Sequence, residues 1–257
     1  TDKEKREKYV KHLYKRLQRE GQLERDVDRL VRNERIAWGA SMIACKDADA
    51  MVTGNIRHYA ASIEKLKKVT DPRPGEEIFG MTMITLKGKT ILVADTNVQD
   101  FPSPERLVKV SKSCVRVARL FGFDPKVAFL SHSTFGKPIS KNTKHVRDAI
   151  DLLKKEKVDF DFDGEMQPDV ALNPIYQEIY PFSKIVGNAN ILIMPALHSA
   201  AISTKLMKVF GGGKLIGPLL IGLGSPIEVA PLRASTSEIL NLASIAAYSS
   251  DVIDYSN

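Results

Sequence analysis

Membrane-spanning and nucleotide-binding signatures are the first things that this sequence lacks. No run of about 18 apolar residues is present, so we expect no transmembrane helix and no membrane partner. No GxxxxGK[ST] motif occurs, which argues against a P-loop ATPase. The glycines Gly211–Gly213 follow an expected helix rather than a strand. They therefore predict a helix end and a turn, not a dinucleotide fingerprint.

Metal-binding and redox patterns are also scarce. The two cysteines, Cys45 and Cys114, form no CxxC motif, and we expect two reduced thiols in a cytoplasmic protein. None of the five histidines makes a metal pair at i, i+4 spacing. Asp159–Gly164 imitates the start of a calcium loop, but Val170 occupies the twelfth position, where a glutamate is needed. We predict no metal site.

Positive charge is present in excess, and much of it lies at the start of the chain. The net charge is +7, and residues 1–35 hold 12 Lys/Arg against 8 Asp/Glu, a surplus of +4. No zinc-finger spacing or aromatic-rich basic stripe accompanies this charge, so we expect no nucleic-acid partner. A charged, helical start is not a signal peptide. The chain begins with Thr1 rather than Met, and we expect a piece of a longer protein.

Apolar periodicity predicts alternating strands and helices, typical of an α/β fold with a mostly parallel sheet and helices on both faces. An expected hairpin turn at Lys87–Lys89 makes part of the sheet antiparallel. The expected helices cover 3–20, 23–32, 36–44, 57–68, 103–121, 140–155, 174–180, 197–209 and a last one from 235. The expected strands cover 50–53, 79–86, 90–94, 126–130, 158–162, 191–194, 215–222 and 227–229.

The segment 222–241 is the most informative of these. A strand end at Ile227–Val229 leads into a polar turn and a helix that begins at Ser235, with Glu238 in its first turn. A strand, a polar loop and a capped helix form the arrangement in which α/β proteins place anion sites and catalytic groups.

Two further loops leave the carboxyl ends of expected strands. Thr53 and Gly54 open one of them. The other contains Ser131, His132, Ser133 and Thr134. Hydroxyls and free backbone N–H groups in such loops can hold a phosphate, although simple turn chemistry is the alternative.

Six segments together resemble the phosphate acetyltransferase (phosphotransacetylase) family over nearly the whole chain. They are Asp49–Gly54, Leu92–Thr96, Phe121–Ser131, Asp163–Leu172, Gly187–Ile193 and Ile216–Pro218. The resemblance implies a two-domain fold similar to isocitrate and isopropylmalate dehydrogenases, a site in the cleft between domains, and a dimer. It also implies acetyl transfer between coenzyme A and phosphate. Because family members carry strand–helix units before the segment seen here, we expect an N-terminally truncated domain. It would have a basic helical opening at 1–35 and a two-subdomain region at 36–257, divided near 95–105 and 240.

The chain departs from the family pattern at the positions that carry charge. Aligned on Ile239–Asn241, the family's serine and arginine fall on Pro231 and Leu232, and its glycine falls on Arg233. A second family arginine falls on Val209, whereas a family lysine is kept as Lys205 and the acid is kept as Glu238. Acyl transfer needs a base and cationic donors for the developing charge, and leucine and valine supply neither. Glu238 could still act as a base, although its longer stem moves the carboxylate, and Arg233 could reach in from the next position if the loop were shifted. The expected ligand-binding residues for coenzyme A or phosphate are Thr53, Gly54, Ser131, His132, Ser133, Thr134, Lys205, Arg233 and Glu238.

The altered loop is similar to the domain that follows the malate-oxidising domain of bacterial NADP-dependent malic enzymes. That resemblance implies a regulatory domain that forms an oligomer and responds to acetyl-CoA. NADP and a divalent metal would belong to the parent chain, and no cofactor would bind here. Two alternatives stay open: a working phosphate acetyltransferase, and a structural oligomerisation module without a ligand.

Overall fold

The structure is a computed structural model that describes residues 3–86, 88–95, 98, 100–139, 141–253 and 255. The chain divides into two compact units, Thr1–Gly75 with Gly222–Asn257, and Glu76–Ile221. The division therefore falls at residues 75 and 221, not near 95–105 and 240 as predicted. The reason is that the strand starting at Phe79 pairs within the second unit on both of its edges.

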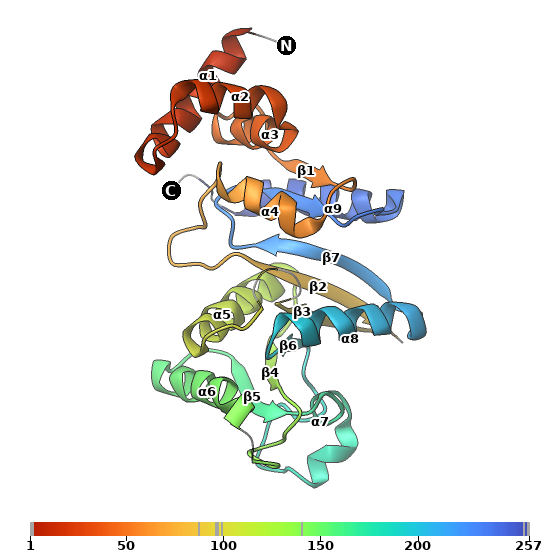
Figure 1. Ribbon diagram of the computed structural model, residues 1–257. Helices are drawn as coiled ribbons and strands as arrows, with labels where there is room; N and C mark the ends of the chain where they lie inside the picture. The colour runs from red at the N-terminus through yellow and green to blue at the C-terminus, as the bar shows by residue number, and fades with distance from the viewer. Residues whose placement is uncertain are drawn as a thin grey trace. The chain divides into compact units, whose positions relative to one another are not determined.

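The first unit combines a helical layer with a short parallel sheet (Figure 1). Strand β1 (Met51–Gly54) pairs with β8 (Ile227–Ala230). Two helices pack against both strands: α4 (Tyr59–Lys67) and α9 (Thr236–Val252). The remaining helices are α1 (Lys3–Leu17), the 3-10 turn η1 (Gln18–Glu20), α2 (Glu24–Asn33) and α3 (Arg35–Ala44).

The basic opening helix is amphipathic, as its sequence predicts. Tyr9, Val10, Leu13 and Leu17 are buried on one face of α1. The ring of Tyr9 meets Trp38 of α3 edge-on, with centroids 5.0 Å apart. Gly21 ends the turn after α1 in the left-handed conformation, with φ 81°. The apolar face of this helix is thus part of the core, and the charged face points to solvent.

The second unit is built on a six-stranded sheet in the order β5-β4-β6-β3-β2-β7. The first four strands run parallel, and β2 is antiparallel to both β3 and β7, so the predicted mixed sheet is confirmed. The strands are β2 (Phe79–Leu86), β3 (Lys89–Ala94), β4 (Lys126–Leu130), β5 (Asp161–Met166), β6 (Ile191–Ile193) and β7 (Lys214–Ile221). Lys87 of the expected hairpin turn lies outside the described residues.

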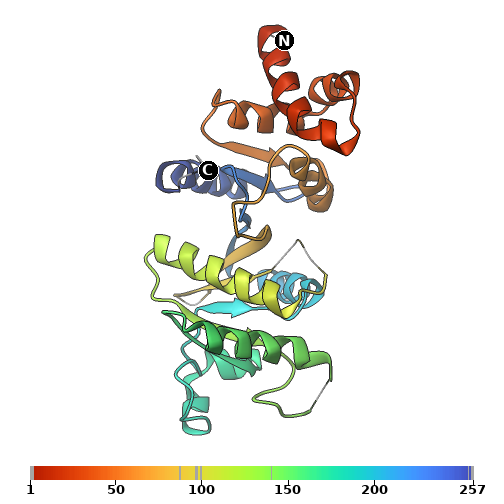
Figure 2. The ribbon, with the colours of Figure 1, turned by 90° about the vertical axis from the view of Figure 1, so that its left-hand side faces the viewer.

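Helices cover both faces of this sheet. Helices α5 (Pro104–Leu120) and α6 (Lys144–Glu156) lie side by side on one face, and α8 (Leu197–Phe210) lies on the other (Figure 2). Ser103 caps α5 by accepting from the backbone N–H of Arg106, with Pro104 in the first turn, as the sequence predicts. The shorter helical segments are η2 (Lys141–Thr143), α7 (Pro168–Leu172) and η3 (Pro174–Glu178).

Two sequence-based element predictions are wrong. The strand expected at 158–162 lies later, at Asp161–Met166, because Lys157 ends α6 in the left-handed conformation and the chain turns before the strand starts. The alternating phenylalanines were misleading, since the buried part of β5 contains the charged Glu165. The helix expected at 174–180 is a short 3-10 segment, and α7 before it was not expected.

Candidate functional site

The predicted loops of the first unit meet at one edge of the β1–β8 sheet. The strands are parallel with Gly54 opposite Ala230, so their carboxyl ends lie together. The N–H of Asn55 donates to the carbonyl of Ala230 at 3.2 Å, and the N–H of Arg233 donates to the carbonyl of Asn55 at 3.0 Å. Thr53, Gly54 and Arg233 are therefore brought to a common edge.

Gly54 is required there by close packing. Its φ is 105°, and a Cβ placed on it would lie 2.3 Å from the carbonyl oxygen of Ala230. Only a residue without a side chain allows the two strand ends to approach this closely. The glycine predicted as a ligand contact thus also has a backbone role.

Helix α9 begins at the same edge with a complete capping box. The hydroxyl of Ser235 accepts from the N–H of Glu238 at 3.2 Å, and Glu238 Oε2 accepts from the Ser235 N–H at 2.8 Å and from its hydroxyl at 2.9 Å. The carboxylate predicted as a catalytic base therefore stabilises the helix start.

The residues just before this cap provide few polar or charged groups that could take part in acyl transfer. Leu232 is 48% exposed and apolar. Arg233 is also exposed, has a φ of 59°, and forms no ion pair with another described residue. One exposed guanidinium is thus the cationic group that this loop presents.

In the second unit, the 131–134 loop leaves the carboxyl end of β4. Ser131 and Ser133 are buried, whereas His132 is exposed. Thr134 is in a turn, where its N–H donates to the Lys137 carbonyl at 2.8 Å. Of the four residues, His132 is exposed, Thr134 is half-buried, and the two serines are buried.

A buried acid that the sequence analysis missed holds this loop. Glu165, 1% exposed, accepts from the hydroxyl of Ser133 at 2.7 Å, the N–H of Gly136 at 3.1 Å and the guanidinium of Arg147 at 3.2 Å. The ion pair compensates the charge, and three donors satisfy the carboxylate. The signal in the sequence was an acidic residue inside a strand, next to Met166.

Lys205 lies elsewhere in the second unit. It is exposed on α8, eight residues after the helix begins at Leu197, or about 12 Å along the axis. It forms no ion pair with a described residue. The structure thus brings Thr53, Gly54, Arg233 and Glu238 together at the β1–β8 edge. It keeps Ser131, His132, Ser133 and Thr134 in one loop of the second unit and places Lys205 separately on α8.

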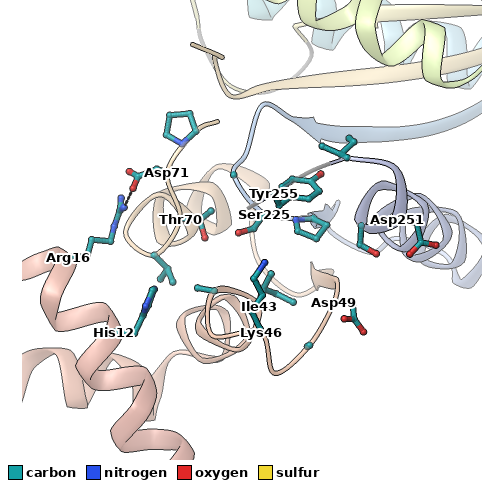
Figure 3. Close-up of a pocket in the computed structure, with 18 of the residues that line it drawn as sticks. His12, Arg16, Ile43, Lys46, Asp49, Thr70, Asp71, Ser225, Asp251 and Tyr255 are labelled. Carbon is teal, nitrogen blue, oxygen red and sulfur yellow. Dashed lines mark hydrogen bonds and ion pairs between the residues drawn. The ribbon is translucent and has the colours of Figure 1, made fainter. Parts of the chain in front are cut away.

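A large pocket that the sequence analysis did not identify lies at the opposite end of the β1–β8 sheet. Its volume is about 1210 Å³, and its walls include residues that precede each strand: Lys46, Ala48 and Asp49 before β1, and Gly224, Ser225 and Pro226 before β8 (Figure 3). Helix α1 contributes His12, Lys15 and Arg16. Burial, followed by the charges of Arg16 and Lys15, lowers the pKa of His12.

The described residues offer neither a metal-binding cluster nor a cysteine with a lowered pKa. Among the described residues, no group of three or more His, Cys, Asp or Glu side chains is arranged to hold a metal ion. Both cysteines are free, as predicted, and burial raises the pKa of each thiol. None of the described helices is long and apolar enough to cross a membrane.

Comparison with known proteins identifies the family. The sequence model of the phosphate acetyl/butaryl transferase family matches residues 1–247. The chain belongs to this family. A phosphotransacetylase structure from Streptococcus pyogenes superposes with a TM-score of 0.87 at 27% identity, covering 95% of this chain and 75% of that one. The predicted phosphotransacetylase fold is therefore confirmed.

The curated relatives include two kinds of protein. An NADP-dependent malic enzyme from Rhizobium meliloti (strain 1021) is 46% identical over 93% of this chain and 32% of its own length. A phosphate acetyltransferase from Bacillus subtilis (strain 168) is 28% identical over 82% of this chain and 66% of its own. The chain thus spans about a third of the length of the malic enzyme that it matches.

Proposed function

We propose that this chain is the phosphotransacetylase-like, C-terminal part of an NADP-dependent malic enzyme, that it does not transfer acetyl groups itself, and that it serves oligomerisation and acetyl-CoA-responsive regulation. The observation that carries the proposal is the 46% identity to a malic enzyme, against 28% to a phosphate acetyltransferase. Malate oxidation, with its NADP and divalent metal, would belong to the rest of the parent chain.

The residues in the loop before α9 support the loss of acetyl transfer. Leu232 is an exposed apolar side chain where the resemblance expects an arginine, and Pro231 stands where it expects a serine. Glu238 is engaged by Ser235, so its carboxylate would have to leave the cap before it could act as a base. With only Arg233 in place of the two arginines that the resemblance expects, a developing oxyanion would be poorly stabilised, at a cost of several kcal/mol in the barrier.

The test of this part is coenzyme A-dependent turnover of acetyl phosphate by the purified protein. We expect no turnover above the uncatalysed background. Turnover that depends on enzyme concentration and falls on Glu238→Ala would overturn the proposal, and would favour the alternative of a working phosphate acetyltransferase.

Acetyl-CoA regulation needs a separate measurement. Calorimetry with acetyl-CoA should give saturable heat, and acetyl-CoA should change the rate of malate-dependent NADP reduction by the full-length parent enzyme. If neither occurs at millimolar acetyl-CoA, the purely structural alternative replaces the regulatory one. His132→Ala and Arg233→Ala examine the two predicted loops separately, because both side chains are exposed and removing them should leave stability within about 0.5 kcal/mol.

An exposed apolar stripe on α8 supports oligomerisation. Ile202, Leu206, Val209 and Phe210 are 59%, 51%, 74% and 82% exposed, at i, i+4, i+7 and i+8 spacing. A stripe of this kind on one helix face is typical of an interface, and a second copy can present the same stripe about a two-fold axis.

The cytoplasmic location predicted for the parent is part of the same proposal.

Sedimentation velocity tests the stripe. Leu206→Lys should shift the protein toward monomer at micromolar concentration, whereas Leu240→Lys, a matched change of an exposed leucine on α9, should not. Equal masses for the wild type and Leu206→Lys would show that this stripe does not hold copies together.

A further inference from the structure

We propose that the pocket at the amino ends of β1 and β8 is a second ligand site, which takes a small molecule carrying a phosphate monoester, with Lys46 as its main counter-ion and the hydroxyls of Thr70 and Ser225 as donors. The site is independent of acetyl transfer and of the carboxyl-edge loops described above. It lies at the other end of the two strands, each four residues or about 13 Å long.

The buried hydroxyl of Thr70 is the observation that points to a ligand. Thr70 is 7% exposed, and its Oγ1 is fully buried with no hydrogen-bond partner among the described residues. A buried hydroxyl left without a partner costs about 1–3 kcal/mol, so its presence calls for an acceptor that the protein itself does not supply. Thr70 lines the pocket (Figure 3), and a rotation about its χ1 would turn the buried hydroxyl toward a ligand there.

Further donors reach the same hollow from other segments. Ser225, 9% exposed, precedes β8, and its hydroxyl is not engaged by a described residue. Lys46 follows α3 with a φ of 60°, and its side chain extends toward Ser225 (Figure 3). Lys46 forms no ion pair within the described part of the chain. One ammonium and two hydroxyls, with His12 and Lys15 on the adjoining wall, give the number of donors that a phosphate needs.

The acidic residues of the pocket do not cancel this charge. Asp71 is paired with Arg16, whose guanidinium also donates to the carbonyls of Lys67 and Lys68 at 3.0 Å each. The carboxylates of Asp49 and Asp251 lie on the far side of the hollow from Thr70 (Figure 3). Lys46 is therefore a positive charge beside Ser225 that no described carboxylate pairs with.

Size and lining indicate an ester rather than free phosphate. A volume of about 1210 Å³ is far larger than one phosphate needs, and it lies above the roughly 300–1,000 Å³ that is usual for small-molecule sites. Ile43, Val69 and Tyr255 line part of the pocket and offer apolar surface to an organic group. The structure thus favours a ligand with a phosphate at the Lys46 end and a larger, partly apolar body.

Calorimetry with inorganic phosphate, adenosine 5′-monophosphate and adenosine tests the proposal on the whole chain. We expect the monophosphate to bind, phosphate to bind more weakly, and adenosine not to bind. Lys46→Gln should weaken the monophosphate at least tenfold, as expected for the loss of a charge-assisted hydrogen bond. Lys11→Gln, on the exposed face of α1, is the matched control and should bind as the wild type does.

Thr70→Val separates a ligand contact from a structural role. Because the hydroxyl has no described partner, the isosteric valine should leave the melting temperature unchanged or higher while affinity falls about tenfold. Ser62→Ala removes another fully buried hydroxyl without a described partner and should raise stability without changing affinity. The proposal is overturned if neither phosphate nor the monophosphate binds. It is also overturned if Lys46→Gln and Thr70→Val bind as tightly as the wild type while His132→Ala loses binding, since the anion then sits on the carboxyl-edge loop.

Discussion

The side chains of Ser235 and Glu238 each satisfy a backbone N–H of the other at the start of α9, and their carboxylate and hydroxyl are 2.9 Å apart. We expect Ser235→Ala to lower the free energy of unfolding by about 1 kcal/mol, because the backbone N–H of Glu238 in the first turn of the helix loses its acceptor. At this chain length that corresponds to a fall in melting temperature of roughly 2–4 °C, measurable by calorimetry.

Two matched variants make that experiment specific. Ser244→Ala, on the exposed face of the same helix, should leave stability equal or slightly higher. Glu238→Gln should cost less than Glu238→Ala, since glutamine can also complete a capping box. If Ser235→Ala were as stable as Ser244→Ala, the cap would contribute nothing and Glu238 would be available for chemistry.

Gly54 gives a second, larger prediction. A methyl group at Gly54 would meet the Ala230 carbonyl at 2.3 Å and would also force a φ of 105° on alanine, so Gly54→Ala should destabilise by roughly 3 kcal/mol or more. Gly21→Ala is the control, because Gly21 also has a positive φ, 81°, but open space around it. We expect a loss of only about 1–2 kcal/mol there. Urea denaturation of both variants measures the difference, and equal losses would contradict the close approach of β1 and β8.

The buried acid Glu165 carries a third prediction. Glu165→Ala removes the acceptor of Ser133, Gly136 and Arg147 at once, and should cost roughly 3 kcal/mol in urea denaturation. Glu156→Ala, which breaks only an exposed ion pair with Lys112 on the same sheet face, should cost no more than about 1 kcal/mol. A small effect of Glu165→Ala would mean that water replaces the carboxylate and that the 131–137 loop does not depend on it.

Helices and strands were predicted well where the hydrophobic periodicity and the helix-capping residues indicate the same boundaries. Strands β2 and β4 begin and end at the expected residues, and α5 starts at the cap and proline that predicted it. The prediction failed at β5, because Glu165 is buried by partners that are 18 to 32 residues away and cannot be inferred from local pattern.

The pocket at the amino ends of β1 and β8 was also beyond sequence reasoning. Lys46, Thr70 and Ser225 come from three segments separated by up to 179 positions, and none of the three belongs to a recognisable motif. The carboxyl-edge loops were predictable because strand–loop–helix order alone fixes where they emerge. Whether they bind acetyl-CoA stays a prediction for the measurements described above.

His12 on α1 gives a pH dependence with a definite sign. Burial lowers its pKa first, and Arg16 and Lys15 lower it further, so the native chain holds its proton less tightly than the unfolded chain does. Between that lowered pKa and the ordinary value of about 6.5, the unfolded chain binds more protons. Stability therefore falls as the pH drops through about 6.5. The loss is small, because the ring is only partly buried and solvent screens the neighbouring charges.

An NMR titration of the His12 ring protons measures the pKa directly. We expect a value below the ordinary one in the wild type, and an increase in Lys15→Gln, because that variant removes one of the neighbouring positive charges. Lys11→Gln controls for a general change in surface charge, since Lys11 is not among the groups that shift this pKa. A wild-type pKa at or above 6.5 would contradict the positive surroundings of His12, and with them the attraction of this wall of the pocket for an anion.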